Sequence, residues 1–168
     1  MADPSSPTGV TSLVVVADDQ NVVDVDVERW RQLATSVVNA LGAHGELSLT
    51  FVDPDTIAEL KGEFLGELAP TDVLAFPMDG GQQGSSDVPM VLGDVVICPE
   101  VAVAQCPEHA GTPDDEIALL VVHGILHLVG HDHADAEETM VMRALERQLL
   151  ETHHWMGPAP TTFRQEQE

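Results

Sequence analysis

Apolar residues recur along this chain in two patterns, one typical of strands and one typical of helices. Short runs rich in valine, leucine and isoleucine predict four strands, because such residues favour the pleated, half-buried surface of a sheet. These strands are expected at residues 12–17, 46–52, 72–76 and 94–98. Longer segments with apolar positions every three or four residues predict helices. The helices are expected at residues 26–41, about 53–64, around 99–105, about 113–129 and roughly 135–152.

The order of these elements predicts the fold class. Strands and helices alternate along the chain, so we expect an α+β fold in which a mixed four-stranded sheet is covered by helices. The segment from about 113 to 129 is apolar on nearly all sides, and this helix should therefore be buried.

Segments without an apolar period predict the boundaries of the folded part. Residues 1–11 are rich in proline, serine and glycine, and the tail 155–168 contains Gly-Pro-Ala-Pro, so we expect both to be disordered. One domain of residues 12–154 remains, with the three-histidine segment inside it. The run 80–89, Gly-Gly-Gln-Gln-Gly-Ser-Ser-Asp-Val-Pro, predicts a mobile loop that could form a rim over a site.

Acidic side chains far outnumber basic ones. Six lysine and arginine residues face 29 aspartate and glutamate residues, for a formal net charge of −23 at pH 7. Such a chain repels nucleic acid on average, so an RNA substrate would need a local positive site or a metal ion. Arg143 and Arg147 form either a small cationic patch or a solvated face in which Arg147 pairs with Glu151.

Two further features bear on location. No run approaches the roughly 18 apolar residues of a membrane-spanning helix, and the amino-terminal Met-Ala-Asp-Pro-Ser-Ser-Pro lacks the basic and apolar regions of a signal peptide. We therefore expect a cytoplasmic protein with no membrane partner.

Residues 123–133, His-Gly-Ile-Leu-His-Leu-Val-Gly-His-Asp-His, carry the most specific chemistry. A helix advances about 100° per residue, so His123 and His127 project from the same face, close enough to share an ion. Gly130 favours a left-handed conformation that ends the helix and turns the chain back. His133 can then supply a third imidazole, and His131 is the alternative third ligand if the helix continues.

Three imidazoles at this spacing predict one bound divalent ion, with zinc first because imidazole suits it. Three protein ligands leave a fourth position for a metal-bound water, whose pKa falls to about 7 and which would be the catalytic group. Asp132 could orient a ligand imidazole or act as a local turn residue. Cys98 and Cys106 are expected to be reduced thiols that pack as small apolar groups, the alternative being that one of them closes a structural zinc site.

The same spacing is that of the metzincin zinc proteases and predicts a zincin-like metal-binding helix. Those proteases place a glutamate directly after the first histidine, where it deprotonates the attacking water. Here that position is Gly124. A metalloprotease or other amide hydrolase is therefore the weaker hypothesis.

Together with two upstream motifs, the histidine segment resembles the YbeY family of metal-dependent endoribonucleases, which mature bacterial ribosomal RNA. The family signature is similar to His-Gly-x-Leu-His-Leu-x-Gly-Tyr-Asp-His, and this chain follows it except that His131 replaces the usual tyrosine. Residues 70–77, Pro-Thr-Asp-Val-Leu-Ala-Phe-Pro, and residues 92–97, Leu-Gly-Asp-Val-Val-Ile, resemble the family's neighbouring strands. The resemblance covers most of the chain.

This resemblance implies a zinc ion held by His123, His127 and His133, and cleavage of single-stranded RNA. It also implies roles in maturation of the 16S rRNA 3′ end and in ribosome quality control, with the small ribosomal subunit or its proteins as partners. The alternative is a ribosome-assembly binding factor with a mainly structural metal, which the acidic composition favours because it suits basic ribosomal proteins.

One position departs from the family pattern. Members often carry an arginine five residues before Pro-Thr-Asp, and here that residue is Leu65. Lys61, one helical turn earlier, offers a point charge without the bidentate fork of arginine. Besides the metal-bound water, the candidate catalytic residues are therefore Asp132, His131 and Lys61.

Overall fold

A four-stranded sheet forms the centre of the computed structural model, which describes residues 13–78 and 91–165. The strands lie in the order β1-β2-β4-β3, and β3 forms one edge. β1, β2 and β4 are parallel, whereas β3 pairs antiparallel with β4. Their bounds are Leu13–Asp18 for β1, Glu46–Phe51 for β2, Val73–Pro77 for β3 and Val91–Ile97 for β4. The predicted mixed four-stranded sheet is confirmed.

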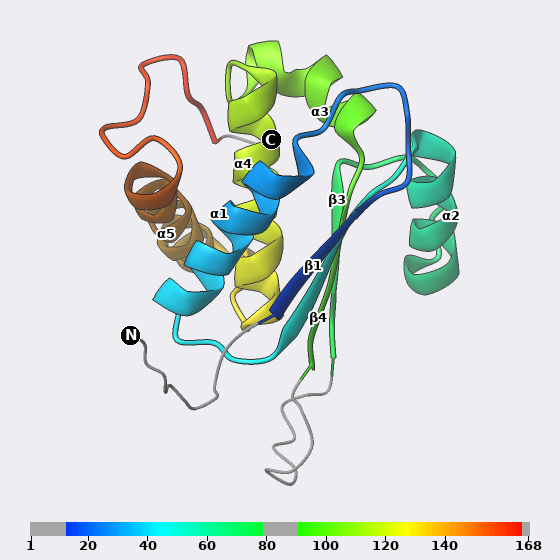
Figure 1. Cartoon of the computed structure of the whole chain (residues 1–168), viewed down its shortest axis with the longest axis horizontal. Helices are drawn as coiled ribbons and strands as arrows, with labels where there is room; N and C mark the ends of the chain where they lie inside the picture. The colour runs from blue at the N-terminus through cyan, green and yellow to red at the C-terminus, as the bar shows by residue number, and fades with distance from the viewer. Residues whose placement is uncertain (1–12, 79–90, 166–168) are drawn as a thin grey trace, which may run out of the picture.

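Helices cover both faces of this sheet (Figure 1). The helices of the chain are α1 (Val27–Ala40), α2 (Pro54–Leu65), α3 (Pro99–Gln105), α4 (Pro113–Leu128) and α5 (Ala136–His153). Helices α1, α4 and α5 lie on one side of the sheet, and α2 lies on the other. The α+β class is therefore confirmed, and each element lies within a few residues of its predicted range.

Polar side chains mark the start of four helices. Asp26, Asp53, Thr112 and Asp135 each accept a hydrogen bond from the backbone N–H three residues later. Each bond satisfies a donor that the first turn of a helix leaves unpaired. Helices α2, α3 and α4 also begin with a proline, which has no N–H to satisfy there.

The main hydrophobic core lies between the sheet and helices α1, α4 and α5. Leu47, Leu49 and Phe51 alternate along β2 toward this core and are at most 1% exposed. Helix α4 is buried on nearly all sides, as its composition predicts. A smaller cluster fills the space between the other sheet face and α2, and it consists of Val52, Ile57, Leu74, Val96 and Cys98.

Helix α4 approaches the sheet closely at Gly124. A β-carbon at this position would lie 2.6 Å from Val95 Cγ1 and 3.1 Å from Val95 Cγ2, whereas nonbonded carbon atoms pack at about 3.5–4.0 Å. Val95 lies on β4, is fully buried and is stiff because it is β-branched. Position 124 therefore has room for glycine alone, and the glutamate of the zinc proteases could not stand there.

The carboxyl-terminal segment is ordered further than its composition predicts. Trp155 Nε1 donates a hydrogen bond to Asp115 Oδ1 at 2.9 Å. The Phe163 ring is 7% exposed and lies 4.8 Å from the Trp155 ring, measured between centroids. The prediction of disorder is wrong for residues 155–165, because these two aromatic side chains bury enough apolar surface to hold a proline-containing segment in place.

The predicted disorder of residues 1–11 and the predicted loop 80–89 lie outside the described residues. In the part of the chain that the structure describes, no helix is both long and apolar enough to cross a membrane.

Replacing Gly124 by alanine should destabilise the fold. Overpacking a core costs about 1–3 kcal/mol, which outweighs the gain of about 1 kcal/mol that alanine brings to a helix. In urea denaturation of chelator-treated protein we therefore expect the free energy of unfolding to fall by up to about 2 kcal/mol. Gly62→Ala is the matched control, because the two atoms nearest to its β-carbon, both at 3.0 Å, belong to the side chain of Leu68, which is 74% exposed and can move. Equal stability of the two variants would contradict the close contact.

Candidate metal centre

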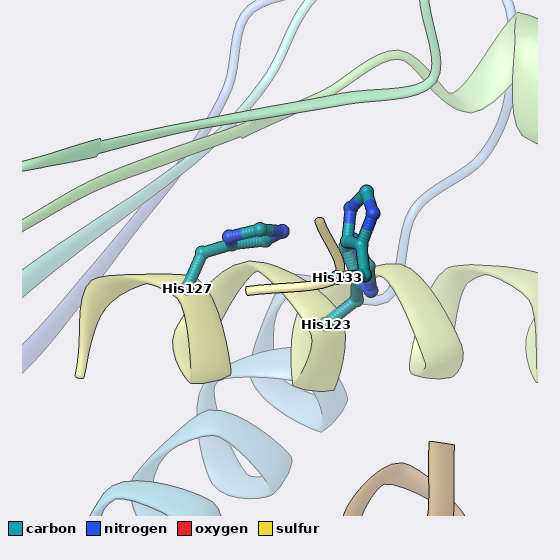
Figure 2. A group of neighbouring side chains, drawn as sticks. All are labelled: His123, His127 and His133. Carbon is teal, nitrogen blue, oxygen red and sulfur yellow. The ribbon is translucent and has the colours of Figure 1, made fainter. Parts of the chain in front are cut away.

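Three imidazole rings gather above one face of α4 (Figure 2). His123 and His127 lie one turn apart on α4, and His133 lies on the segment that follows. The rings are 4.7 to 5.4 Å apart between centroids. One nitrogen from each ring can be chosen so that all three lie within 4.8 Å of one another. The group could therefore hold a single metal ion.

Gly130 turns the chain so that His133 reaches the other two histidines. Its φ is +104°, in the range that glycine adopts without steric penalty. The N–H of His131 donates to the carbonyl of Leu126 at 3.0 Å, which satisfies a carbonyl at the helix end. Because the helix ends here, His131 lies outside the group.

Glu146 of α5 holds His123 in a fixed orientation. Its Oε2 lies 2.6 Å from His123 Nδ1, and its side chain is 5% exposed. An ionised carboxylate only accepts hydrogen bonds, so the tautomer of the neutral ring that fits this contact has its proton on Nδ1 and a free lone pair on Nε2. Gln165 Nε2 donates to Glu146 Oε1 at 3.0 Å and to the carbonyl of Arg143 at 2.9 Å. Both carboxylate oxygens therefore have partners.

The surroundings of the group fit a divalent ion. Burial lowers the pKa of His127, and repulsion from the neighbouring His123 and His133 rings, whenever these are protonated, lowers it further. A neutral imidazole keeps the lone pair that a metal requires. Cys98 and Cys106 are buried, which raises the pKa of both thiols, and neither belongs to the group. Among the described residues the donors that converge are thus three imidazoles and no sulfur.

A groove of about 1,490 Å³ passes the histidines and continues around the edge strand β3. On the α4 side it is lined by the histidine group, Glu146 and Arg143, and on the α2 side by Phe64, Leu65 and Phe76. The Phe64 ring is 60% exposed and lies 5.1 Å from the Phe76 ring between centroids. Small-molecule pockets usually measure about 300–1,000 Å³, so this groove suits an extended chain better than a small metabolite.

A second histidine–carboxylate pair lies beside this groove, and its histidine, His109, lines it. His109 Nδ1 lies 2.8 Å from Glu116 Oε2, and Glu116 is fully buried in the first turns of α4. Gln105 Nε2 donates to both Glu116 Oε2 at 2.6 Å and Asp72 Oδ2 at 2.8 Å. His109 Nε2 is buried without a hydrogen-bond partner among the described residues. The hydrogen bond to Glu116 raises the pKa of His109, although burial opposes the rise.

The other candidate residues lie in different settings. Asp132 is exposed, and its Oδ1 accepts from the backbone N–H of His133 at 2.8 Å, as a turn residue does. Lys61 Nζ lies 3.5 Å from Glu67 Oε1, and Lys61 is not among the described residues that line the groove. Leu65 ends α2, lines the groove and is 62% exposed.

Sequence analysis did not identify Glu146 or Glu116. Each is an acidic residue at a buried helix position, and Glu146 follows buried Met142 by four residues and precedes buried Leu149 by three. A buried carboxylate is costly unless it is paired. An acid at an inward position of a helix is therefore the signal that could have indicated a histidine partner.

Comparison with known proteins gives one family. The profile described as endoribonuclease YbeY matches residues 15–154. A protein named endoribonuclease YbeY from Thermobifida fusca is 44% identical over 137 residues, which cover 79% of this chain and 88% of the relative. The protein of the same name from Acidothermus cellulolyticus is 44% identical over 148 residues, covering 82% and 90%. That from Mycolicibacterium vanbaalenii is 34% identical over 163 residues, covering 93% and 88%.

A solved structure shares the fold. The solution structure of a Thermotoga maritima protein is similar with a TM-score of 0.57 and 23% sequence identity, over 86% of this chain and 92% of that chain.

The His109–Glu116 pair should make stability depend on pH. Because the folded pKa of His109 is raised, its contribution is fully present below the unperturbed pKa of about 6.5 and is lost as the pH rises through the folded value. His109→Gln keeps a donor but removes the titrating ring. We expect urea denaturation at pH 6 to show the variant less stable by about 1 kcal/mol, the difference between a charge-assisted and an ordinary hydrogen bond, and the difference should shrink by pH 9. Parallel stability profiles across this range would contradict the assignment.

Proposed function

Because this chain belongs to the endoribonuclease YbeY family, we propose that it is a metal-dependent endoribonuclease that cleaves single-stranded RNA. The observation that carries the proposal is the convergence of His123, His127 and His133 on one wall of a long groove. All three lie inside the segment that matches the family.

We propose that the three histidines hold one zinc ion, since imidazole suits zinc and no softer donor converges with them in the described part of the chain. Bound zinc would supply Lewis-acid polarisation of a phosphate oxygen and would lower the pKa of water or of a ribose hydroxyl. The protein's own contribution is orientation. Glu146 would accept the Nδ1 proton of His123 in a hydrogen bond and so leave Nε2 as the ligand atom, while burial lowers the pKa of His127 and favours its neutral form.

The shape and lining of the groove support a single-stranded substrate. Its path around the edge strand β3 requires a flexible polymer. The exposed Phe64 ring beside Phe76 offers a stacking surface, and stacking on an aromatic side chain requires an unpaired base. A base-paired helix would keep its bases inside and could not use this surface.

We further propose that the substrate is 16S rRNA at its 3′ end, that the enzyme takes part in ribosome quality control, and that it acts in the cytoplasm. The net charge of −23 suits contact with basic proteins of the small ribosomal subunit. The same charge supports the alternative of an assembly factor whose metal is mainly structural. Peptide hydrolysis has less support, because Gly124 provides no general base and Val95 leaves no room for one.

Removal of one histidine should abolish both metal binding and RNA cleavage. We expect His133→Ala to lose zinc on dialysis and to cleave a single-stranded RNA oligonucleotide at least about 100-fold more slowly. Plasma mass spectrometry measures the metal, and gel electrophoresis measures cleavage. His131→Ala is the matched control, since it removes the same kind of ring from outside the group. The proposal fails if His133→Ala keeps both properties, and a zinc-loaded wild type that binds ribosomal proteins but never cuts RNA would favour the assembly factor.

A cation introduced at Leu65 should strengthen RNA binding. The side chain is exposed at the groove, so Leu65→Arg gains about one phosphate contact, and the slope of log affinity against log salt becomes steeper by about 0.7. Leu65→Gln is the neutral control of similar length. Fluorescence anisotropy with labelled single-stranded RNA at several salt concentrations measures the slope. Identical slopes for the two variants would place Leu65 outside the path of the RNA backbone.

A further inference from the structure

The cations of this protein are few, and most of them are already paired. Four of the six form salt bridges with acidic side chains: Arg29 with Asp114, Arg31 with Glu28, Lys61 with Glu67 and Arg147 with Glu151. Arg143 and Arg164 form no ion pair with the described residues. A polyanion that approaches this acidic surface therefore meets very few free positive charges.

Arg143 is the one cation of the six that lines the groove in the described structure. It lies half-buried on α5, one residue after buried Met142 and three residues before Glu146. The groove wall that contains Arg143 thus also contains His123, His127 and His133.

The backbone around Arg143 is held from outside α5. Gln165 Nε2 donates to the Arg143 carbonyl at 2.9 Å and to Glu146 Oε1 at 3.0 Å. A single amide therefore ties the turn that carries Arg143 to the carboxylate that orients His123. Gln165 lies beyond residues 15–154, the segment that matches the family.

We propose that Arg143 is the phosphate-binding residue of the groove and contacts a backbone phosphate of the RNA strand beside the histidine group. This inference rests on the proposed function. The guanidinium is always charged and can donate two parallel hydrogen bonds to a phosphate. Its cost of ordering is reduced because the side chain is half-buried on a helix. In a protein with a net charge of −23, a local cation is what RNA binding requires.

Arg147 provides an internal comparison. It lies one turn further along α5, pairs with Glu151 at 3.4 Å and is 52% exposed. It is absent from the described lining of the groove. Arg143 and Arg147 therefore carry the same charge on the same helix and differ in their access to the groove.

The test compares Arg143→Gln with Arg147→Gln in the full chain. The probe is a fluorescein-labelled single-stranded RNA, and binding is measured by anisotropy with chelator-treated protein so that the probe stays intact. We expect Arg143→Gln to bind roughly tenfold more weakly at low salt and its salt slope to be smaller by about 0.7. Arg147→Gln should match the wild type. Arg143→Lys should recover part of the affinity, because it restores the charge without the fork.

Zinc affinity, measured by competition with a chromophoric chelator, distinguishes failure of the phosphate assignment from failure of the proposed function. We expect Arg143→Gln to bind zinc at least as tightly as the wild type, because a neighbouring positive charge is gone. Loss of zinc binding in Arg143→Gln would show that Arg143 acts on the metal group and would overturn the phosphate assignment. Equal RNA affinity of the two glutamine variants would overturn it as well. A wild type that binds zinc but no RNA would refute the proposed function itself.

Discussion

Where α4 crosses β4, Gly124 lets the helix backbone come so close to the buried Val95 that no side chain fits between them. The rest of the site follows from this approach. It holds α4 firmly against the sheet with the flanking His123 and His127 beside the groove, and it excludes an acidic residue from the position where zinc proteases carry their base. A packing requirement thus limits the chemistry that this histidine group can perform.

Two buried carboxylates give the site its rigidity. Glu146 and Glu116 lie on different helices, each satisfies a histidine, and each takes further hydrogen bonds from a glutamine side chain. In a low-dielectric interior an unpaired carboxylate would be strongly unfavourable, so each carboxylate requires its hydrogen-bond partners. In return, each carboxylate orients the histidine that it contacts. The polar networks therefore select one arrangement of α4, α5 and the carboxyl-terminal segment.

What the sequence could predict was local. Three kinds of feature act over only a few residues: helix caps such as Asp53 and Thr112, the alternation of apolar residues along β2, and the four-residue spacing of His123 and His127. The periodicity of the sequence therefore identified the elements and the histidine group. Glu146 and Gln165 could not be assigned to His123 in this way, because tertiary packing brings them there. The order of residues 155–165 was missed for the same reason, since Phe163 is buried through tertiary contacts with Trp155 and the main hydrophobic core.

The histidines lie within eleven residues of one another, whereas Glu146 joins His123 from 23 residues away. Closing loops as short as those between the histidines costs little chain entropy, so an unfolded chain already presents the ligands as a flexible chelating segment. An ion that binds both states stabilises the native fold only through the difference between its two affinities. That difference resides in the distant carboxylate and in burial. During synthesis, the segment that can capture an ion emerges before α5, which gives it its fixed shape.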